Sequence, residues 1–176
     1  MLKKFKNFIL GDSFIAQLIR QIIYCVIILN IIINFVFIPC VVDGSSMYPT
    51  LHEDDLGYSF IISRNISINR FDIAVIRIDE NGQLLVKRLI GMPNETITYK
   101  DNKLYINGEY YEEPFLKNDV ITNDFSVTLG DDEYYLLGDN RGVSRDCRYY
   151  GPINKSQIVS THIFVIKPLA NFGMKK

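Results

Sequence analysis

The chain contains no tryptophan, two histidines and three cysteines, and it carries almost no net charge. Cys25, Cys40 and Cys147 are far apart and form no CxxC pair, which argues against a disulfide framework and against zinc or redox chemistry of that type. A formal net charge of −1 at pH 7 lacks the basic excess with which proteins attract nucleic acids. We therefore expect no nucleic-acid partner, no metal and no other cofactor.

Hydrophobic residues make up 48% of the 176 residues and charged residues 22%. This balance is typical of a folded protein with a packed core and excludes a disordered chain. The length corresponds to one domain, with room for an appendage.

The hydrophobic residues are concentrated near the N-terminus, where residues 21–42 contain no Asp, Glu, Lys or Arg. About 20 apolar residues in a helix span the roughly 30 Å hydrocarbon core of a bilayer. A buried core helix of this length usually has a charged face, and a cleavable signal peptide has a shorter apolar region before an AxA-like site. We therefore expect residues 21–42 to form an uncleaved transmembrane anchor.

The charges before the anchor predict its direction. Residues 1–20 carry four basic side chains and one acidic side chain, namely Lys3, Lys4, Lys6, Arg20 and Asp12. By the positive-inside rule, this segment stays in the cytoplasm. The sequence therefore predicts a single-pass protein of the cytoplasmic membrane, with the lipid bilayer as a partner and residues 43–176 as an extracytoplasmic domain.

This domain is predicted to be mainly β and antiparallel. Short segments rich in Val, Ile, Tyr and Phe alternate with turn residues, a pattern that favours strands. Asn-Gly pairs at 81–82 and 107–108 are typical of tight hairpin turns. The predicted strands are residues 72–78, 84–90, 96–99, 103–106, 133–137 and 163–166.

The first cluster that suggests chemistry is Asp-Gly-Ser-Ser-Met-Tyr-Pro-Thr-Leu at residues 43–51. A serine between a glycine and a Met-x-Pro corner can expose its hydroxyl on a bend whose backbone N–H groups point at a reacting carbonyl. A membrane-exit turn is the simpler interpretation of this segment alone.

The second cluster is Val-Lys-Arg-Leu-Ile-Gly-Met-Pro at residues 86–93. Because strand side chains alternate, Lys87 shares a face with Leu85 and Leu89. Apolar surroundings lower the pKa of a lysine, and the neutral amine can accept a proton from serine. The alternative is a lysine whose amine reaches back to water.

The third cluster, residues 138–151, packs two aspartates, three arginines, a serine and three glycines into one segment. Opposite charges in a glycine-rich loop predict an internal network of ion pairs. An ordinary solvated surface loop is the alternative.

Together these clusters resemble the sequence boxes of bacterial type I signal peptidases, the membrane-bound Ser/Lys proteases that remove signal peptides from exported proteins. That family has a Ser-Met-x-Pro-Thr box, a Lys-Arg box followed by Gly-x-Pro, and a Gly-Asp-Asn-Arg-x-x-Ser-x-Asp-x-Arg-x-x-Gly box, in this order after an N-terminal anchor. All three are present in this sequence. The short chain with one span is similar to the Gram-positive type.

The resemblance implies Ser46 as the nucleophile, Lys87 as the general base and Ser144 as the residue that orients the lysine amine. Some relatives hold the oxyanion with a serine at the position of Gly44, so here the backbone N–H of Ser46 is the main expected donor. The residues expected to support the active-site loop are Asp139, Arg141, Asp146 and Arg148.

The implied substrates are preproteins with small residues one and three positions before the cut, bound as an added strand. Their side chains are expected to enter apolar pockets lined by Val42, Met47, Leu51, Leu85 and Val86. Three positions depart from the family pattern: Phe71 and Asn94 replace glycines, and Cys147 replaces a serine. None of them is the nucleophile or the base, so activity is still expected.

Two other functions stay open. A signal-peptidase-like assembly factor would bind envelope or pilin precursors without cutting them, but known versions lose the serine or the lysine. A self-cleaving Ser/Lys repressor would need a DNA-binding domain where the anchor lies. A Ser-His-Asp triad is disfavoured, because its histidine would be His162 or His52, and His52 lies in an acidic turn.

The predicted orientation can be tested with protease added to intact spheroplasts. We expect residues 43–176 to be digested, because the charges of residues 1–20 place this domain outside the membrane. Protection of the domain until the cells are lysed would contradict the orientation and the role in export.

Overall fold

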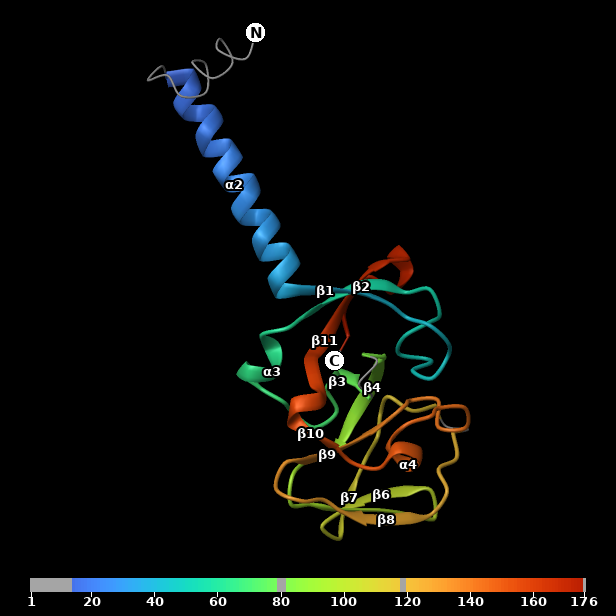
Figure 1. Cartoon of the computed structure of the whole chain (residues 1–176). Helices are drawn as coiled ribbons and strands as arrows, with labels where there is room; N and C mark the ends of the chain where they lie inside the picture. The colour runs from blue at the N-terminus through green and yellow to red at the C-terminus, as the bar shows by residue number, and fades with distance from the viewer. Residues whose placement is uncertain (1–13, 79–81, 118–119, 176) are drawn as a thin grey trace. The chain divides into compact units, whose positions relative to one another are not determined.

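The computed structural model describes residues 14–78, 82–117 and 120–175 (Figure 1). Most of the predicted cytoplasmic segment, and Asn81 of the first predicted turn, lie outside the described residues. The chain divides into two units at the boundary between Phe37 and Ile38.

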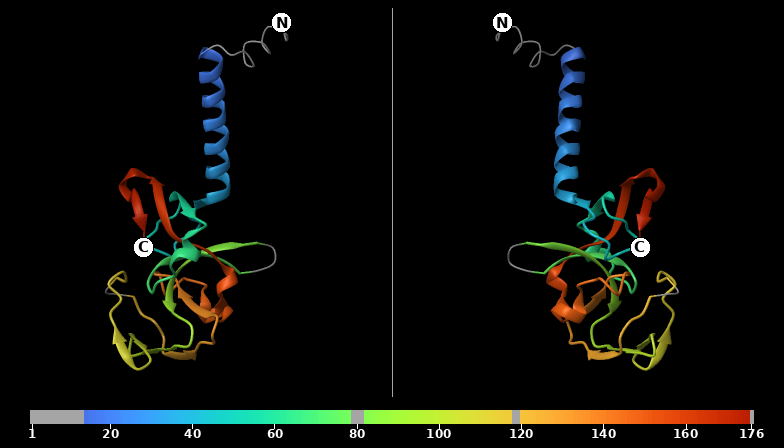
Figure 2. Two further views of the ribbon diagram at one scale, coloured as in Figure 1. Left: turned by 90° about the vertical axis from the view of Figure 1, so that its left-hand side faces the viewer. Right: turned by 90° about the vertical axis from the view of Figure 1, so that its right-hand side faces the viewer.

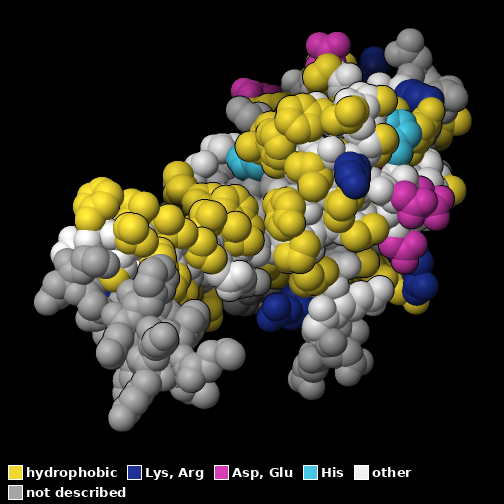
Figure 3. All heavy atoms as spheres, turned by 90° about the horizontal axis from the view of Figure 1, so that it is seen from above, with side chains coloured by type: hydrophobic (Ala, Val, Ile, Leu, Met, Phe, Trp, Pro, Cys, Tyr) yellow, Lys and Arg dark blue, Asp and Glu magenta, His cyan; other side chains and the backbone are white. Residues whose placement is uncertain are grey.

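The N-terminal unit contains helix α2 (Phe14–Val36). Its first 20 residues, Phe14–Ile33, are long and apolar enough to cross a membrane. Exposed hydrophobic side chains occur along this helix, and hydrophobic side chains are prominent in the space-filling view (Figure 3).

The helix differs at both ends from the predicted span of residues 21–42. It begins earlier, because one arginine, Arg20, does not stop a helix and its long side chain can reach a polar interface. It ends at Val36, and β1 (Phe37–Val41) follows. Pro39 lacks the N–H that a helix needs and favours extended backbone at the residue before it.

The second unit is built on an eight-stranded sheet in the order β1-β2-β11-β3-β4-β9-β10, with β12 paired to β11. Figure 2 shows the strands of this unit from two further sides. The pairs from β2 to β10 are antiparallel. The remaining strands of this sheet are β2 (Leu56–Phe60), β3 (Ile73–Arg77), β4 (Leu84–Gly91), β9 (Glu133–Leu137), β10 (Ile153–Asn154), β11 (Ile158–Lys167) and β12 (Gly173–Lys175).

A second sheet lies in the chain between β4 and β9 and has the antiparallel order β7-β6-β5-β8. It consists of β5 (Thr96–Lys100), β6 (Lys103–Ile106), β7 (Glu109–Tyr111) and β8 (Phe125–Thr128). Short helices α3 (Ser63–Ile66), α4 (Cys147–Tyr150), η1 (Lys155–Gln157) and η2 (Leu169–Asn171) complete the domain.

The prediction of a mainly β, antiparallel domain is confirmed. Both predicted hairpin turns join antiparallel partners, β3 with β4 and β6 with β7. At the second turn Asn107 and Gly108 both have positive φ, as the Asn-Gly pair predicts. The predicted strand at 163–166 is only part of β11, which continues in both directions.

Two hydrophobic cores support the segments that carry the predicted site residues. The first lies between the small sheet, β4, β9 and α4, and includes Tyr99, Leu136 and Cys147. The second lies beneath β1 and the segment after it, and includes Met47 and Leu51, which are 1% and 0% exposed. Burying these two side chains anchors the bend that carries the predicted nucleophile.

Strand register brings the sequence clusters together. Arg88 on β4 lies opposite Leu137 at the end of β9, and the third cluster begins at the next residue, Gly138. The segment after β1 is held by Val42, whose N–H donates to Asp55 O and whose carbonyl accepts from the Asp54 N–H, both at 2.9 Å. These contacts explain how segments distant in sequence meet around one bend.

Candidate active site

Ser46 and Lys87 are in direct contact. The Lys87 Nζ and the Ser46 Oγ are 2.8 Å apart and hydrogen-bonded, and the Lys87 Nζ also donates to the Val86 carbonyl at 3.0 Å. Only 3% of Lys87 is exposed. The amine is therefore buried against the serine, and the alternative of a lysine that reaches back to water is excluded.

Burial lowers the pKa of Lys87 below its ordinary value, because desolvation disfavours the charged amine. The nearby side chains of Asp146, Cys147 and Asp139 act in the opposite direction but do not cancel this effect. The neutral amine is consequently more populated than in an exposed lysine. A neutral amine at hydrogen-bond distance can take the proton of the serine hydroxyl.

The backbone around Ser46 is held by the third cluster. The Asn140 N–H donates to the Ser46 carbonyl at 3.0 Å, and the Asn140 side-chain amide donates to the Ser45 carbonyl at 3.2 Å. The Ser46 N–H makes no hydrogen bond within the part of the chain that the structure describes. Gly44 has φ +80° and open space where a Cβ would be. The Ser46 N–H is therefore free of other acceptors among the described residues, and Gly44 has no side chain that would obstruct an incoming carbonyl.

A buried ion pair joins the three clusters. The Arg88 Nε and Nη2 donate to the two Asp139 carboxylate oxygens at 2.8 and 2.7 Å. Thr50 Oγ1 donates to the same carboxylate and accepts from the Arg88 Nη2 at 3.1 Å. One residue from each cluster takes part, so this network fixes the positions of the segments that carry Ser46 and Lys87.

Arg141 ties the third cluster to the small sheet. Its guanidinium donates to the Tyr99 hydroxyl at 2.7 Å and to Thr122 Oγ1 at 3.0 Å, and it forms an ion pair with Glu113. Arg141 is buried, with 3% exposed. The small sheet therefore acts as a brace for the loop beside the serine.

Asp146 stabilises the second half of this loop. Burial alone would raise its pKa, but hydrogen bonds from Arg148 and from the Gly138 N–H lower the pKa of the Asp146 carboxyl. The Arg148 guanidinium also donates to the Arg141 carbonyl at 2.8 Å. The predicted internal ion pairing of this segment is found for Asp146 with Arg148. Asp139 and Arg141 are also buried in ion pairs, but their partners, Arg88 and Glu113, lie outside the segment.

Ser144 lies beside the same bend. A Cβ on Gly138 would collide with Ser144 Oγ and with the Ser46 carbonyl, so only glycine permits this close packing. Ser144 Oγ is buried and has no hydrogen-bond partner among the described residues. Its hydroxyl therefore makes no hydrogen bond to Lys87 in this structure.

An open cavity of about 360 Å³ gives access to the serine and the lysine. Of the predicted pocket residues, only Leu85 lines it. Val42, Met47 and Leu51 are buried in the second core, and Val86 packs against that core. The residues that line the cavity are Asp43, Gly44, Ser45, Ser46, Gln83, Leu85, Lys87, Val143, Arg145 and Tyr150.

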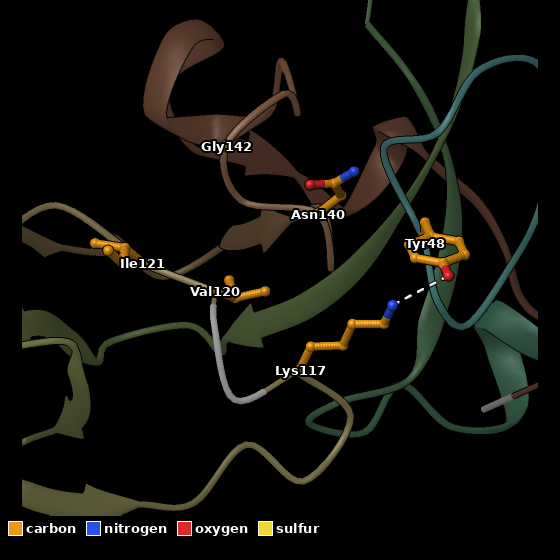
Figure 4. A pocket seen from close by; sticks show the side chains of 6 residues that line it. All are labelled: Tyr48, Lys117, Val120, Ile121, Asn140 and Gly142. Atoms are coloured by element: carbon orange, nitrogen blue, oxygen red, sulfur yellow. Dashed lines mark hydrogen bonds between the residues drawn. The ribbon is translucent and has the colours of Figure 1, made fainter.

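A second cavity of about 400 Å³ lies on Asn140 and Gly142 of the same loop (Figure 4). Its wall includes Tyr48, whose hydroxyl accepts a hydrogen bond from the Lys117 Nζ at 3.0 Å. The Lys117 Nζ also lies 4.2 Å from the centroid of the Tyr48 ring. This contact links the segment after Ser46 to the connection between β7 and β8 of the small sheet.

The three departures from the family pattern are accommodated. The Cys147 thiol accepts the Leu136 N–H at 3.2 Å, and burial raises its pKa to about 12, so it remains protonated at neutral pH. Phe71 and Asn94 have φ of +69° and +65°, backbone that glycine adopts without strain. The Phe71 ring contacts the Phe115 ring, and the Arg88 guanidinium lies 4.0 Å from the centroid of that ring.

Sequence reasoning did not identify Arg88, Thr50 and Asn140 as parts of the site. Arg88 could have been found from its place in a strand whose neighbours are apolar, because a buried arginine needs a carboxylate partner. Nothing in the sequence says which aspartate that partner is. The structure assigns it to Asp139.

Comparison with known proteins identifies the family of this chain. A family model described as signal peptidase, peptidase S26, matches residues 15–167. Signal peptidase I S of Bacillus subtilis (strain 168) is 38% identical over 167 residues, which cover 88% of this chain and 90% of that protein. Signal peptidase I of Bacillus amyloliquefaciens is 39% identical over 160 residues, 85% of this chain and 86% of that protein. A signal peptidase I structure from Enterococcus faecalis V583 is 34% identical and has a TM-score of 0.49, over 54% of this chain and 96% of that one.

The relatives identify the class of protein as a serine peptidase. The chain belongs to the signal peptidase S26 family. Membership supports cleavage of signal peptides from preproteins, and the apolar helix α2 fits a membrane anchor.

The role of the buried ion pair can be tested by substitution of Arg88. Arg88→Ala leaves the Asp139 carboxylate buried without its partner, so we expect a loss of about 3–5 kcal/mol in the free energy of unfolding. Arg77→Ala, an exposed arginine on β3, is the control and should change it by less than about 0.5 kcal/mol. Denaturant unfolding of the full chain in detergent measures both. Equal effects of the two substitutions would show that the ion pair does not hold the domain together.

Proposed function

We propose that the protein is a single-pass membrane serine endopeptidase that removes signal peptides with a Ser46 nucleophile and a Lys87 general base. In this proposal residues 1–20 are cytoplasmic and the β domain lies outside the cytoplasmic membrane. The observation that carries the proposed mechanism is the 2.8 Å contact between the serine hydroxyl and a buried lysine amine whose pKa is lowered.

The geometry supports the following first step. The neutral Lys87 amine takes the Ser46 hydroxyl proton as the oxygen attacks the carbonyl of the residue before the cut. The Ser46 N–H, which is not used within the described chain, donates to the resulting oxyanion. The protonated Lys87 then gives its proton to the leaving amine, so the new N-terminus departs and an acyl-enzyme remains.

The second step reverses these roles. Lys87, neutral again, takes a proton from a water molecule that attacks the acyl carbonyl. It then gives this proton to the Ser46 oxygen, which leaves as a hydroxyl, so the acid is released and the amine is neutral again. No histidine is needed, and neither histidine lines the cavity that contains Ser46 and Lys87. In this proposal the second core, with Val42, Met47 and Leu51, forms the apolar floor beneath the small residues before the cut.

We further propose that Ser144 orients the lysine amine during turnover, as the family resemblance implies. Its buried hydroxyl has no hydrogen-bond partner among the described residues, so it is available to a group that moves into reach. Asp139, Arg141, Asp146 and Arg148 act as supports through the ion pairs of the loop.

A non-cleaving assembly factor is the second candidate function. The site argues against it, because both the serine and the lysine are present and hydrogen-bonded to each other. Such a factor has no need of a desolvated amine.

The dyad is tested by single-turnover cleavage, in detergent, of a preprotein with alanine one and three positions before the cut. Ser46→Ala and Lys87→Ala should abolish cleavage, because one removes the attacking oxygen and the other the base. Lys87→Arg should also fail, since a guanidinium is not deprotonated in proteins. Lys103→Ala, an exposed lysine on β6, is the control and should cleave normally.

The outcomes separate the candidates. Near-normal turnover by Lys87→Arg would show that the lysine is not a general base. Binding of the preprotein by the unmodified protein without any cleavage would favour the assembly factor.

Ser144→Ala should retain detectable cleavage, reduced by about 10² to 10⁴ in rate, the usual contribution of a well-placed base. The acyl-enzyme route stays available in this variant, because the nucleophile and the base are both still present. The same single-turnover assay measures this, and complete loss of cleavage with an unchanged unfolding midpoint would assign Ser144 a direct chemical role.

A further inference from the structure

The third cluster contains three arginines with two different environments. Arg141 and Arg148 are paired with Glu113 and Asp146. Arg145 is exposed and forms no ion pair within the described part of the chain. Its guanidinium instead lies 4.4 Å from the centroid of the Tyr149 ring, a contact that positions a cation without neutralising it.

Arg145 lines the same cavity as Ser46 and Lys87. Val143 and Tyr150 line this cavity with it, and all three come from the segment after β9. An unpaired positive charge is thus built into the wall of the cavity where the scissile bond must lie. No carboxylate of the described chain forms an ion pair with it.

The proposed function assigns the two parts of a substrate to different segments. In that proposal the residues before the cut lie over the second core, which contains Val42 and Met47. The wall of Val143, Arg145 and Tyr150 belongs to another segment and shares no residue with that core. With the residues before the cut assigned to that core, the proposed function leaves this wall for the residues that follow the cut.

We infer that Arg145 is a specificity-determining residue that favours preproteins with an acidic side chain among the first residues after the cut. This inference rests on the proposed peptidase function and adds a charge preference to it. A carboxylate in that part of the substrate gains an ion pair with Arg145, and a lysine meets repulsion.

Asp43 is the opposing charge in the cavity. It is exposed and comes from the segment before Ser46, so the two exposed charged side chains that line the cavity, Asp43 and Arg145, lie on different segments. Asp43 repels the same substrate carboxylate that Arg145 attracts. Removing the Asp43 charge should therefore strengthen the preference for acidic residues, and removing or reversing the Arg145 charge should weaken it.

The expected effect is modest, because both charges are exposed. Exposed ion pairs contribute at most about a fivefold change in an equilibrium or rate ratio, and salt weakens them. We expect the unmodified protein to cleave a preprotein with Glu at the second position after the cut about three- to fivefold faster, in kcat/KM, than one with Lys there.

The experiment compares three preproteins, with Glu, Gln or Lys at that position and alanine one and three positions before the cut. They are cleaved by the full chain in detergent at low and at high salt. The variants are Arg145→Glu, Arg145→Gln and Asp43→Asn, and Lys103→Glu on the small sheet is the matched charge-reversal control. Each variant is judged by its Glu to Lys ratio of kcat/KM, so a general loss of rate does not enter the comparison.

The ratio should fall to about one in Arg145→Gln, invert in Arg145→Glu, rise in Asp43→Asn and stay unchanged in Lys103→Glu. High salt should bring all ratios toward one. An unchanged ratio in Arg145→Glu, or the same change in Lys103→Glu, would overturn the inference. So would a charge preference found only for residues before the cut. Absence of cleavage of all three preproteins by the unmodified protein would instead contradict the proposed function.

Discussion

The site depends on one amine that is kept out of water while it contacts one hydroxyl. Burying Lys87 lowers its pKa, but the same low-dielectric surroundings would let any nearby carboxylate hold the amine in its charged form. Asp139 and Asp146 are such carboxylates, and each has its own arginine, Arg88 and Arg148. These ion pairs reduce the pull of the two carboxylates on the lysine, so burial determines the direction of its pKa shift.

The same pairs also organise the chain. Arg88 follows Lys87 directly in the chain. Asp139 lies in the loop whose next residue, Asn140, donates a hydrogen bond to the Ser46 carbonyl. Thr50, from the segment after the serine, contacts both Arg88 and Asp139. A single buried network thus sets the electrostatics of the base and the distance between base and nucleophile. Removing one partner is expected to disturb both.

Much of the fold could be predicted from local patterns. The Asn-Gly turns and the β-branched segments identify hairpins, because positive φ and strand preference are local properties. Lys87 between Leu85 and Leu89 predicts a desolvated amine for the same reason. The start of α2 at Phe14 was not predicted, because a single Arg20 within a helix leaves no boundary signal.

The tertiary contacts of the site were less accessible to sequence reasoning. Pairing of Arg88 with Asp139 depends on the register of β4 against β9, and the sequence offers other aspartates of equal chemistry. The free charge of Arg145 becomes visible only when Arg141 and Arg148 are seen to be paired. Met47 and Leu51, which were expected to line substrate pockets, lie in the second core, and apolar pattern alone does not distinguish a pocket wall from the core beneath it.

The protonation state of Lys87 tests this account most directly. NMR of the full chain in detergent, with labelled lysine side chains and the Lys87 signal assigned by its loss in Lys87→Arg, follows the amine as pH is raised. We expect Lys87 to lose its proton at a pH below the ordinary lysine value of 10.5 and before the exposed lysines do. Titration of Lys87 together with or after the exposed lysines would contradict the account, because the amine would then be charged when it must accept the serine proton.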